Sequence, residues 1–140
     1  MKTKYTPLVT VKKNLMDKSQ RVLQSANADL NSASVALKMS YDGLSDITFP
    51  NSGSISTFMA SRTLLSSQRD LIKHNQQWVR FAKNQVQLAK EKLKADMIEH
   101  EKFKYLEVEE MKKIIQEQKL KEAKELDEIA LIGYGLKEKR

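Results

Sequence analysis

The sequence predicts an all-α fold: a long antiparallel two-helix coiled-coil hairpin with an overhanging C-terminal helix. The 140 residues include only four glycines and two prolines, too few to end the many short strands of a sheet. Apolar residues recur at helical spacing on both sides of one polar stretch. We therefore expect a single coiled-coil domain over residues 1–140.

The first predicted helix covers about residues 5–45. Its apolar stripe advances by three, four and four residues and so repeats every eleven, which favours a stripe that runs almost straight along the helix axis. Ten of its eleven positions are apolar, so the helix needs a partner. The stripe consists of Leu8, Val11, Leu15, Ser19, Val22, Ala26, Leu30, Ala33, Leu37, Tyr41 and Leu44.

A tip loop is predicted at about residues 46–54, where Pro50 and Gly53 stand close together. The second helix should cover about residues 55–132, followed by a frayed tail at 133–140. Its stripe has strict heptad spacing, with seven of nine positions apolar. These positions are Leu65, Gln68, Ile72, Asn75, Val79, Ala82, Val86, Ala89 and Leu93.

Two long helices joined by a short loop bury their stripes by folding back on each other. With the loop centred near residue 50, position i should face about position 100 − i, which leaves residues from Lys94 onward without a partner. An apolar thread still follows this overhang, and it needs a cover, which could be a second copy of the chain or a different protein. The thread comprises Met97, Val108, Met111, Ile115, Leu126 and Ile129.

No residue set in the sequence points to chemistry, so we expect neither an enzyme nor a cofactor. Glycine-rich phosphate loops, nucleophile elbows and cysteines are all missing from the sequence. The run Glu99, His100 and Glu101 does not predict a metal site, because neighbours on a helix point about 100° apart. A two-helix hairpin also lacks the concave site that catalysis needs.

The net charge of +7 raises nucleic acid as a possible partner. The chain has no basic region ahead of a zipper, and the aromatics Trp78 and Phe81 are not interleaved with arginines. We therefore expect no nucleic acid, and an acidic protein surface as the complement of the basic shaft. Without an apolar signal region or an 18-residue apolar window, a cytosolic protein with no membrane insertion is expected.

Three segments resemble the FliJ family, the coiled-coil proteins of the bacterial flagellar type III export apparatus. On the first helix the segment is "ANADLNSASVALKMSYDGL", and on the second it is "QQWVRFAKNQVQLAKEKLKADMIEHEKFKYLE". The most specific piece is "KELDEIA", Lys124 to Ala130, which is similar to the Leu-Asp-Glu signature that closes the long helix in that family. The resemblance covers nearly the whole chain.

The resemblance implies an antiparallel stalk without enzymatic activity. Such a stalk associates with the hexameric export ATPase FliI, contacts the export gate protein FlhA and takes part in recycling export chaperones. It implies a cytoplasmic protein, peripheral at the inner-membrane base of the flagellum through the export gate. Two alternatives stay open: a free-standing coiled coil that homodimerises, and the equivalent stalk of a virulence type III secretion system.

The resemblance implies two sets of contact residues. The alternative interpretation is that the residues of the tip half only pack within the hairpin, and that the lysines at the base form a solvated face. The candidates for export-gate contact, in the tip half, are Tyr41, Leu44, Leu64, Leu71 and Trp78. The candidates for ATPase contact, at the base and on the overhang, are Lys12, Lys13, Lys90, Lys92, Met111, Ile115 and Ile129.

Overall fold

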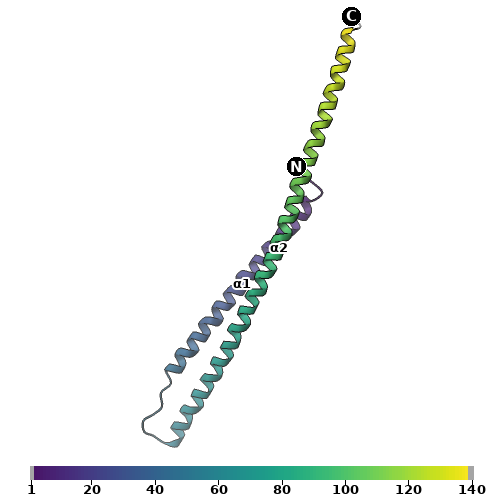
Figure 1. The fold of residues 1–140 in the computed structure, drawn as a ribbon. Coiled ribbons are helices and arrows are strands. Elements are labelled where there is room, and N and C mark those ends of the chain that lie inside the picture. Colours follow the sequence, from purple (N-terminus) through teal and green to yellow (C-terminus); the bar gives the residue numbers. More distant parts are fainter. Residues whose placement is uncertain (1, 139–140) are drawn as a thin grey trace. The chain divides into compact units, whose positions relative to one another are not determined.

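The computed structural model describes residues 2–138 and confirms the all-α helical hairpin (Figure 1). Helix α1 spans Thr6–Ser45, residues 46–54 form the connection, and helix α2 spans Ile55–Glu138. No strand occurs in this described part of the chain. Helix α2 includes Gly133 and Gly135 of the predicted tail and ends at Glu138, because a glycine in a helix costs only about 1 kcal/mol relative to alanine and does not by itself end it. Residues 139–140 of that tail lie outside the described residues.

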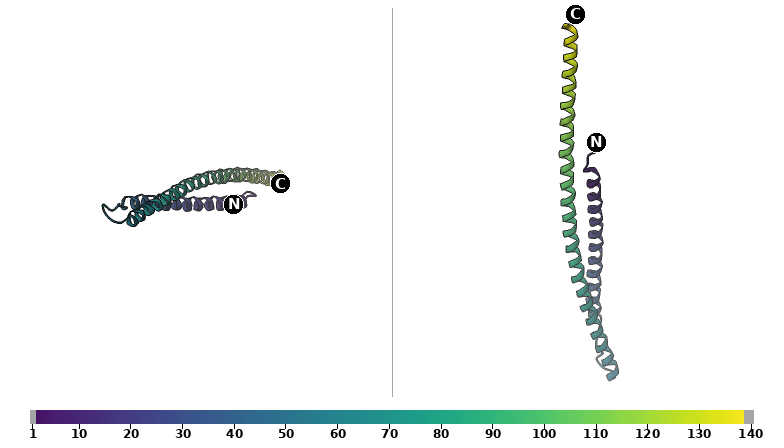
Figure 2. Two further views of the ribbon diagram at one scale, coloured as in Figure 1. Left: turned by 90° about the horizontal axis from the view of Figure 1, so that it is seen from below. Right: turned by 90° about the vertical axis from the view of Figure 1, so that its right-hand side faces the viewer.

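Contacts divide the chain into two compact units, each of which is described by itself. One unit comprises residues 16–96, and the other joins residues up to Leu15 with those from Met97 onward. Within the unit 16–96, α1 and α2 lie side by side and run in opposite directions in every view (Figures 1 and 2). The packing of this unit fixes how the two helices are aligned.

The predicted heptad stripe of α2 is confirmed as the buried seam. All nine predicted positions are buried or half-buried, whereas their immediate neighbours along the helix are exposed. Ala82 is 3% exposed and Ala89 is 6% exposed. The seam continues in the same spacing to Asp96, which is 8% exposed. A seam with this period is typical of a left-handed coiled coil.

The predicted eleven-residue stripe of α1 is wrong in its first half. Leu8, Val11, Leu15 and Val22 are between 41% and 51% exposed, as is Tyr41 near the other end. The prediction failed because α1 carries apolar pairs such as Leu8–Val9 and Val22–Leu23. Packing against the heptads of α2 places the second residue of each pair in the seam. The seam positions of α1 are Val9, Lys12, Met16, Ser19, Leu23, Ala26, Leu30, Ala33, Leu37, Ser40 and Leu44.

Small side chains occupy one seam position in four successive heptads of α1. These are the four buried residues of the helix, Ser19, Ala26, Ala33 and Ser40. Ala33 has no exposed surface, and Ala26 packs with Val86 and Ala89 in a cluster that Leu23 and Leu30 cover. Small residues let the two helices approach closely, so larger side chains at these positions would overpack the seam.

Polar side chains in the seam of α2 form hydrogen bonds to α1. Two of them, Gln68 and Asn75, lie seven residues apart at the same heptad position of α2. The Gln68 amide donates to the carbonyl oxygen of Ser40 at 2.8 Å, and the Asn75 amide donates to that of Ala36 at 3.2 Å. A Cβ on Gly43 would stand 2.6 Å from the Gln68 amide nitrogen. Gly43 is therefore required for this close approach of the Gln68 side chain.

The third polar contact is a buried pair near the end of the unit. The Ser19 hydroxyl donates to Asp96 Oδ2, and Lys92 Nζ lies 3.2 Å from Asp96 Oδ1. Ser19 and Asp96 are 6% and 8% exposed. Buried polar groups that satisfy each other favour one alignment, since sliding the helices would break the contact between Ser19 and Asp96.

The predicted 100 − i register is wrong. It placed Ser40 opposite residue 60 and Ser19 opposite residue 81, whereas they contact Gln68 and Asp96. The loop does not turn symmetrically, because residues 55–60 of α2 are all exposed and face the connection rather than the end of α1. Phe49 packs on Phe58 there, with ring centroids 5.5 Å apart.

The shifted register also corrects the start of the overhang. In the second unit, Lys12 Nζ lies 3.7 Å from Glu99 Oε2 and 5.6 Å from the ring centroid of Phe103. Tyr5 lies beside Leu106. Residues 97 to about 110 of α2 therefore have a partner in the first turns of α1, and the overhang does not begin at Lys94.

We predict that Ser19→Ala lowers the free energy of unfolding by about 1–3 kcal/mol, since it removes a hydrogen-bond donor from a buried carboxylate. Urea denaturation measures this change, with Ser25→Ala, an exposed position of the same helix, as the control. In a double-mutant cycle with Asp96→Ala the two effects should be strongly non-additive. Additive effects would show that Ser19 and Asp96 do not act as a pair.

Candidate functional site

An exposed apolar row follows the buried seam along α2. Leu64, Leu71 and Trp78 are seven residues apart, each one position before a seam residue, and they are 57%, 45% and 38% exposed. Phe81 and Leu88, also exposed, extend this apolar row. Since a residue one position earlier lies about 100° around the helix, the row faces one flank of the hairpin. The apolar row contains three of the five candidates for gate contact.

The other two gate candidates lie apart from the apolar row. Leu44 is half-buried at the end of the seam. Tyr41 follows a seam residue instead of preceding one, and its hydroxyl accepts a 2.7 Å hydrogen bond from the Gln76 amide. The structure therefore does not bring the five residues into one surface, while Phe81 and Leu88 belong to the apolar row and were missed. Their heptad spacing from Trp78 and Leu71 was the available signal.

The candidate lysines at the base divide into two kinds. Lys12 is half-buried beside Glu99 and Phe103, and Lys92 pairs with Asp96, so both have structural partners within the chain. Lys13 and Lys90 are exposed, and neither has an ion pair among residues 2–138. Only the second pair is free to meet an acidic partner without breaking an existing contact.

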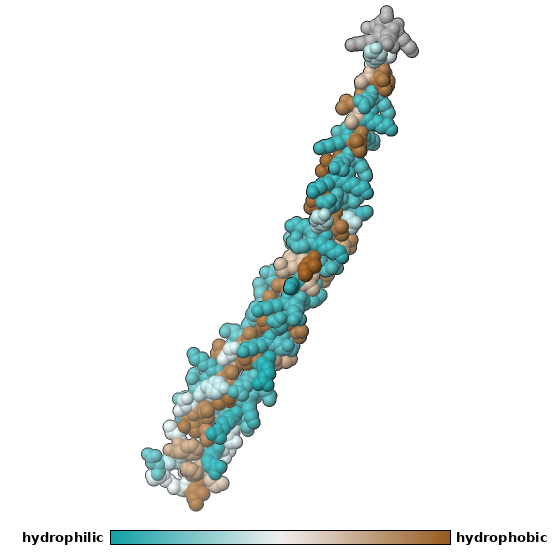
Figure 3. All heavy atoms as spheres, in the orientation of Figure 1, coloured by the Kyte–Doolittle hydropathy of each residue, from teal (hydrophilic) through white to brown (hydrophobic). Residues whose placement is uncertain are grey.

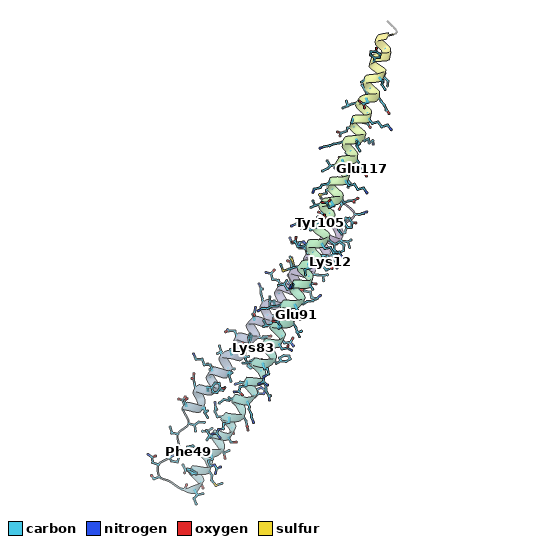
Figure 4. The ribbon with its side chains drawn as sticks, in the orientation of Figure 1. Lys12, Phe49, Lys83, Glu91, Tyr105 and Glu117 are labelled. Atoms are coloured by element: carbon cyan, nitrogen blue, oxygen red, sulfur yellow. The ribbon has the colours of Figure 1, made fainter. Side chains whose placement is uncertain are left out.

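The end of α2, residues 115–136, is an exposed C-terminal segment. Every residue in it except Gly135 is exposed, including Ile115 at 40% and Ile129 at 65%, whereas Met111 just before it is half-buried. Glu117 lies on this stretch, which α1 does not accompany (Figure 4). Apolar and polar atoms both reach the surface along it (Figure 3).

The C-terminal segment exposes more apolar side chains than the predicted thread contained. Residues 129–136, "IALIGYGL", carry no charge, and this run was the sequence signal that the predicted thread overlooked. The exposed large side chains outside the thread are Leu120, Leu131, Ile132, Tyr134 and Leu136. Such a concentration of exposed apolar surface marks an interaction site.

Chemically reactive groups do not converge in the described structure. A shallow hollow on α2 is lined by His74, Gln77, Trp78 and Phe81. Across residues 2–138, His, Cys, Asp and Glu side chains form no cluster of three that could hold a metal ion. Within the same range, neither helix contains a stretch long and apolar enough to cross a bilayer.

A helical hairpin with a buried heptad seam, an exposed apolar row and an uncovered helix end defines an antiparallel coiled-coil protein. The family model for the flagellar FliJ protein matches residues 1–139. The chain therefore belongs to the FliJ family, which makes it a component of the flagellar type III export apparatus. No curated protein and no solved structure matches the chain significantly.

Proposed function

We propose that this chain is the non-enzymatic stalk of the flagellar export ATPase. In this role its C-terminal segment and base bind the FliI hexamer, its apolar row binds the export gate protein FlhA, and it helps to escort or recycle export chaperones. It works in the cytoplasm, peripheral to the inner-membrane base of the flagellum. Family membership supports the setting, and the exposed C-terminal segment carries the proposal.

The distribution of apolar residues around the C-terminal segment favours an enclosing partner. Residues 129–132 are four successive apolar residues, and at about 100° per residue they reach nearly all the way around the helix. A helix that is apolar all round is stable when it is buried on all sides. The central opening of a ring can surround a helix end, whereas a flat surface covers only one side.

Homodimerisation through the C-terminal segment is the second candidate function. It is favoured by the same exposed apolar side chains, but a two-stranded coiled coil covers one stripe on each helix. Residues 129–132 would then keep apolar side chains in water on the far side.

The match to a flagellar family also favours the flagellar system over the virulence system as the setting.

The apolar row of α2 is proposed as the gate contact. Trp78 is the chain's single tryptophan, and it lies at 38% exposure between Leu71 and Phe81. Large aromatics that remain partly exposed are enriched among the residues that dominate binding energy. Tyr41 is left out of this contact because its hydroxyl is held by Gln76 on the opposite flank.

We predict that Ile115→Lys combined with Ile129→Lys abolishes capture of FliI while the hairpin stays folded. Both side chains are exposed, so the change removes apolar area from an interface, at about 25 cal/mol per Å², and not from the core. A pull-down with purified FliI measures capture, and a sizing column measures the oligomeric state of each variant.

The control introduces the same charge at polar positions of the same segment, Gln116→Lys with Gln118→Lys, and should leave capture intact. Full capture by the isoleucine variant would contradict the proposed contact. Capture that persists while a dimer becomes a monomer would identify the segment as a homodimer seam instead.

We predict that Leu71→Lys weakens binding to the cytoplasmic part of FlhA at least about tenfold, because it places a charge in the centre of the apolar row. Val35→Lys is the matched control, since Val35 is 46% exposed and Leu71 is 45% exposed. Titration of FlhA with labelled protein gives both affinities. Equal affinities of the two variants for FlhA would contradict the proposal that the apolar row contacts the gate.

A further inference from the structure

We propose that the flank of the hairpin opposite the apolar row lies directly on an anionic membrane surface. The partner that we assign is a bilayer rich in anionic phospholipid. The flank contacts the lipid headgroups and does not insert into the bilayer. This contact goes beyond the proposed stalk function, in which the chain reaches the membrane only through the export gate.

The flank is defined by the residues that directly follow each seam position of α2. Between Gln68 and Leu93 the seam has eight such followers, and six are basic while the other two are glutamines. We call the six basic residues the cationic row. They are Arg69, Lys73, Arg80, Lys83, Lys90 and Lys94, and all are exposed.

None of the six has a carboxylate partner in the described part of the chain, where the ion pairs involve Lys12, Lys92, His100 and Lys112. The nearest acidic residues in sequence, Asp70 and Glu91, stand three positions before Lys73 and Lys94 and therefore border the row near its two ends. Glu91 accepts a 3.4 Å hydrogen bond from the Gln87 amide, which belongs to this flank. Six exposed cations against two bordering carboxylates leave this flank with a net positive charge.

Helix α1 completes the flank with a polar, nearly uncharged row. One hydrogen bond shows that followers of the two seams share a side, since Gln76 follows Asn75, Tyr41 follows Ser40, and Gln76 donates to the Tyr41 hydroxyl at 2.7 Å. The followers in α1 between residues 20 and 38 are all exposed, and none is acidic, whereas Asp17, which follows Met16 at one end of the unit, is half-buried. They are Gln20, Gln24, Asn27, Asn31, Ser34 and Lys38.

The geometry of the cationic row favours a plane of charge. Because the row follows the seam, it runs along one side of the helix for about 37 Å at 1.5 Å per residue. Clusters of four to eight Lys or Arg on one helix face are typical of binding to anionic lipid. Lys83 lies within this row, on the part of α2 beside α1 (Figure 4).

Other anionic partners fit less well. Single-stranded nucleic acid binds through aromatic side chains on which bases stack, and Trp78 and Phe81 lie on the other flank. The backbone of a duplex winds away from a straight row, and specific protein interfaces have an apolar centre that this flank lacks. Since Tyr41, at one end, is the one large apolar side chain among these followers, the flank should adsorb to headgroups and not enter the acyl region.

The test is co-sedimentation of the full chain with vesicles. We expect binding to equal parts phosphatidylcholine and phosphatidylglycerol at about 0.1 M salt, little binding to phosphatidylcholine alone, and release as added salt shortens the Debye length below about 10 Å. Removing four cations from the row should weaken binding at least about 100-fold. The row variant combines Arg69→Gln, Lys73→Gln, Arg80→Gln and Lys83→Gln.

A control variant with the same net charge separates the row from overall charge, and it should bind within a few-fold of the unchanged chain. Its four exposed positions lie beyond the unit 16–96. It combines Lys104→Gln, Lys113→Gln, Lys119→Gln and Lys121→Gln. Equal loss in both variants, no binding to anionic vesicles, or tighter binding to a short duplex DNA than to vesicles would each overturn the proposal.

The single tryptophan reports which flank meets the bilayer. Trp78 lies on the apolar row, so its fluorescence should keep its wavelength and its access to an aqueous quencher when vesicles are added. A blue shift with loss of quenching would show that the apolar row inserts instead, and would contradict the assigned orientation.

Discussion

The alignment of α1 with α2 along their seam is the constraint on which the rest of the structure depends. Small residues bring the helices close, and polar pairs such as Ser19 with Asp96 make sliding unfavourable, because it would break hydrogen bonds between the helices in the buried seam. This alignment decides which residues become flanks. The apolar row, the cationic row and the length of uncovered α2 all follow from it.

Fold class could be predicted from the sequence because missing breakers and heptad spacing act over many residues. The seam of α2 followed from the same signal. The stripe of α1 could not be predicted in the same way. In apolar pairs such as Val22 and Leu23, the partner helix decides which of the two residues enters the seam. The register failed because the Phe49 contact with Phe58 belongs to a loop whose shape no periodicity encodes.

The candidate sites were predicted unevenly for a related reason. Leu71 and Trp78 could be found because exposed apolar residues at seven-residue spacing fall on one flank. That Tyr41 lies on the other flank could not be predicted, since its side of the seam depends on the true heptad of α1. With this heptad in place, one hairpin carries two chemically different flanks and an apolar end, which suits a component that joins several partners.

Cysteine cross-linking tests the alignment most directly, because the chain has no cysteine of its own. A disulfide needs Cα atoms within about 7 Å, and Ala26 packs with Ala89 in one cluster. The account predicts rapid oxidation of the pair Ala26→Cys and Ala89→Cys within one chain. The symmetric loop would instead pair Ala26→Cys with His74→Cys, and faster oxidation of that pair would contradict the seam described.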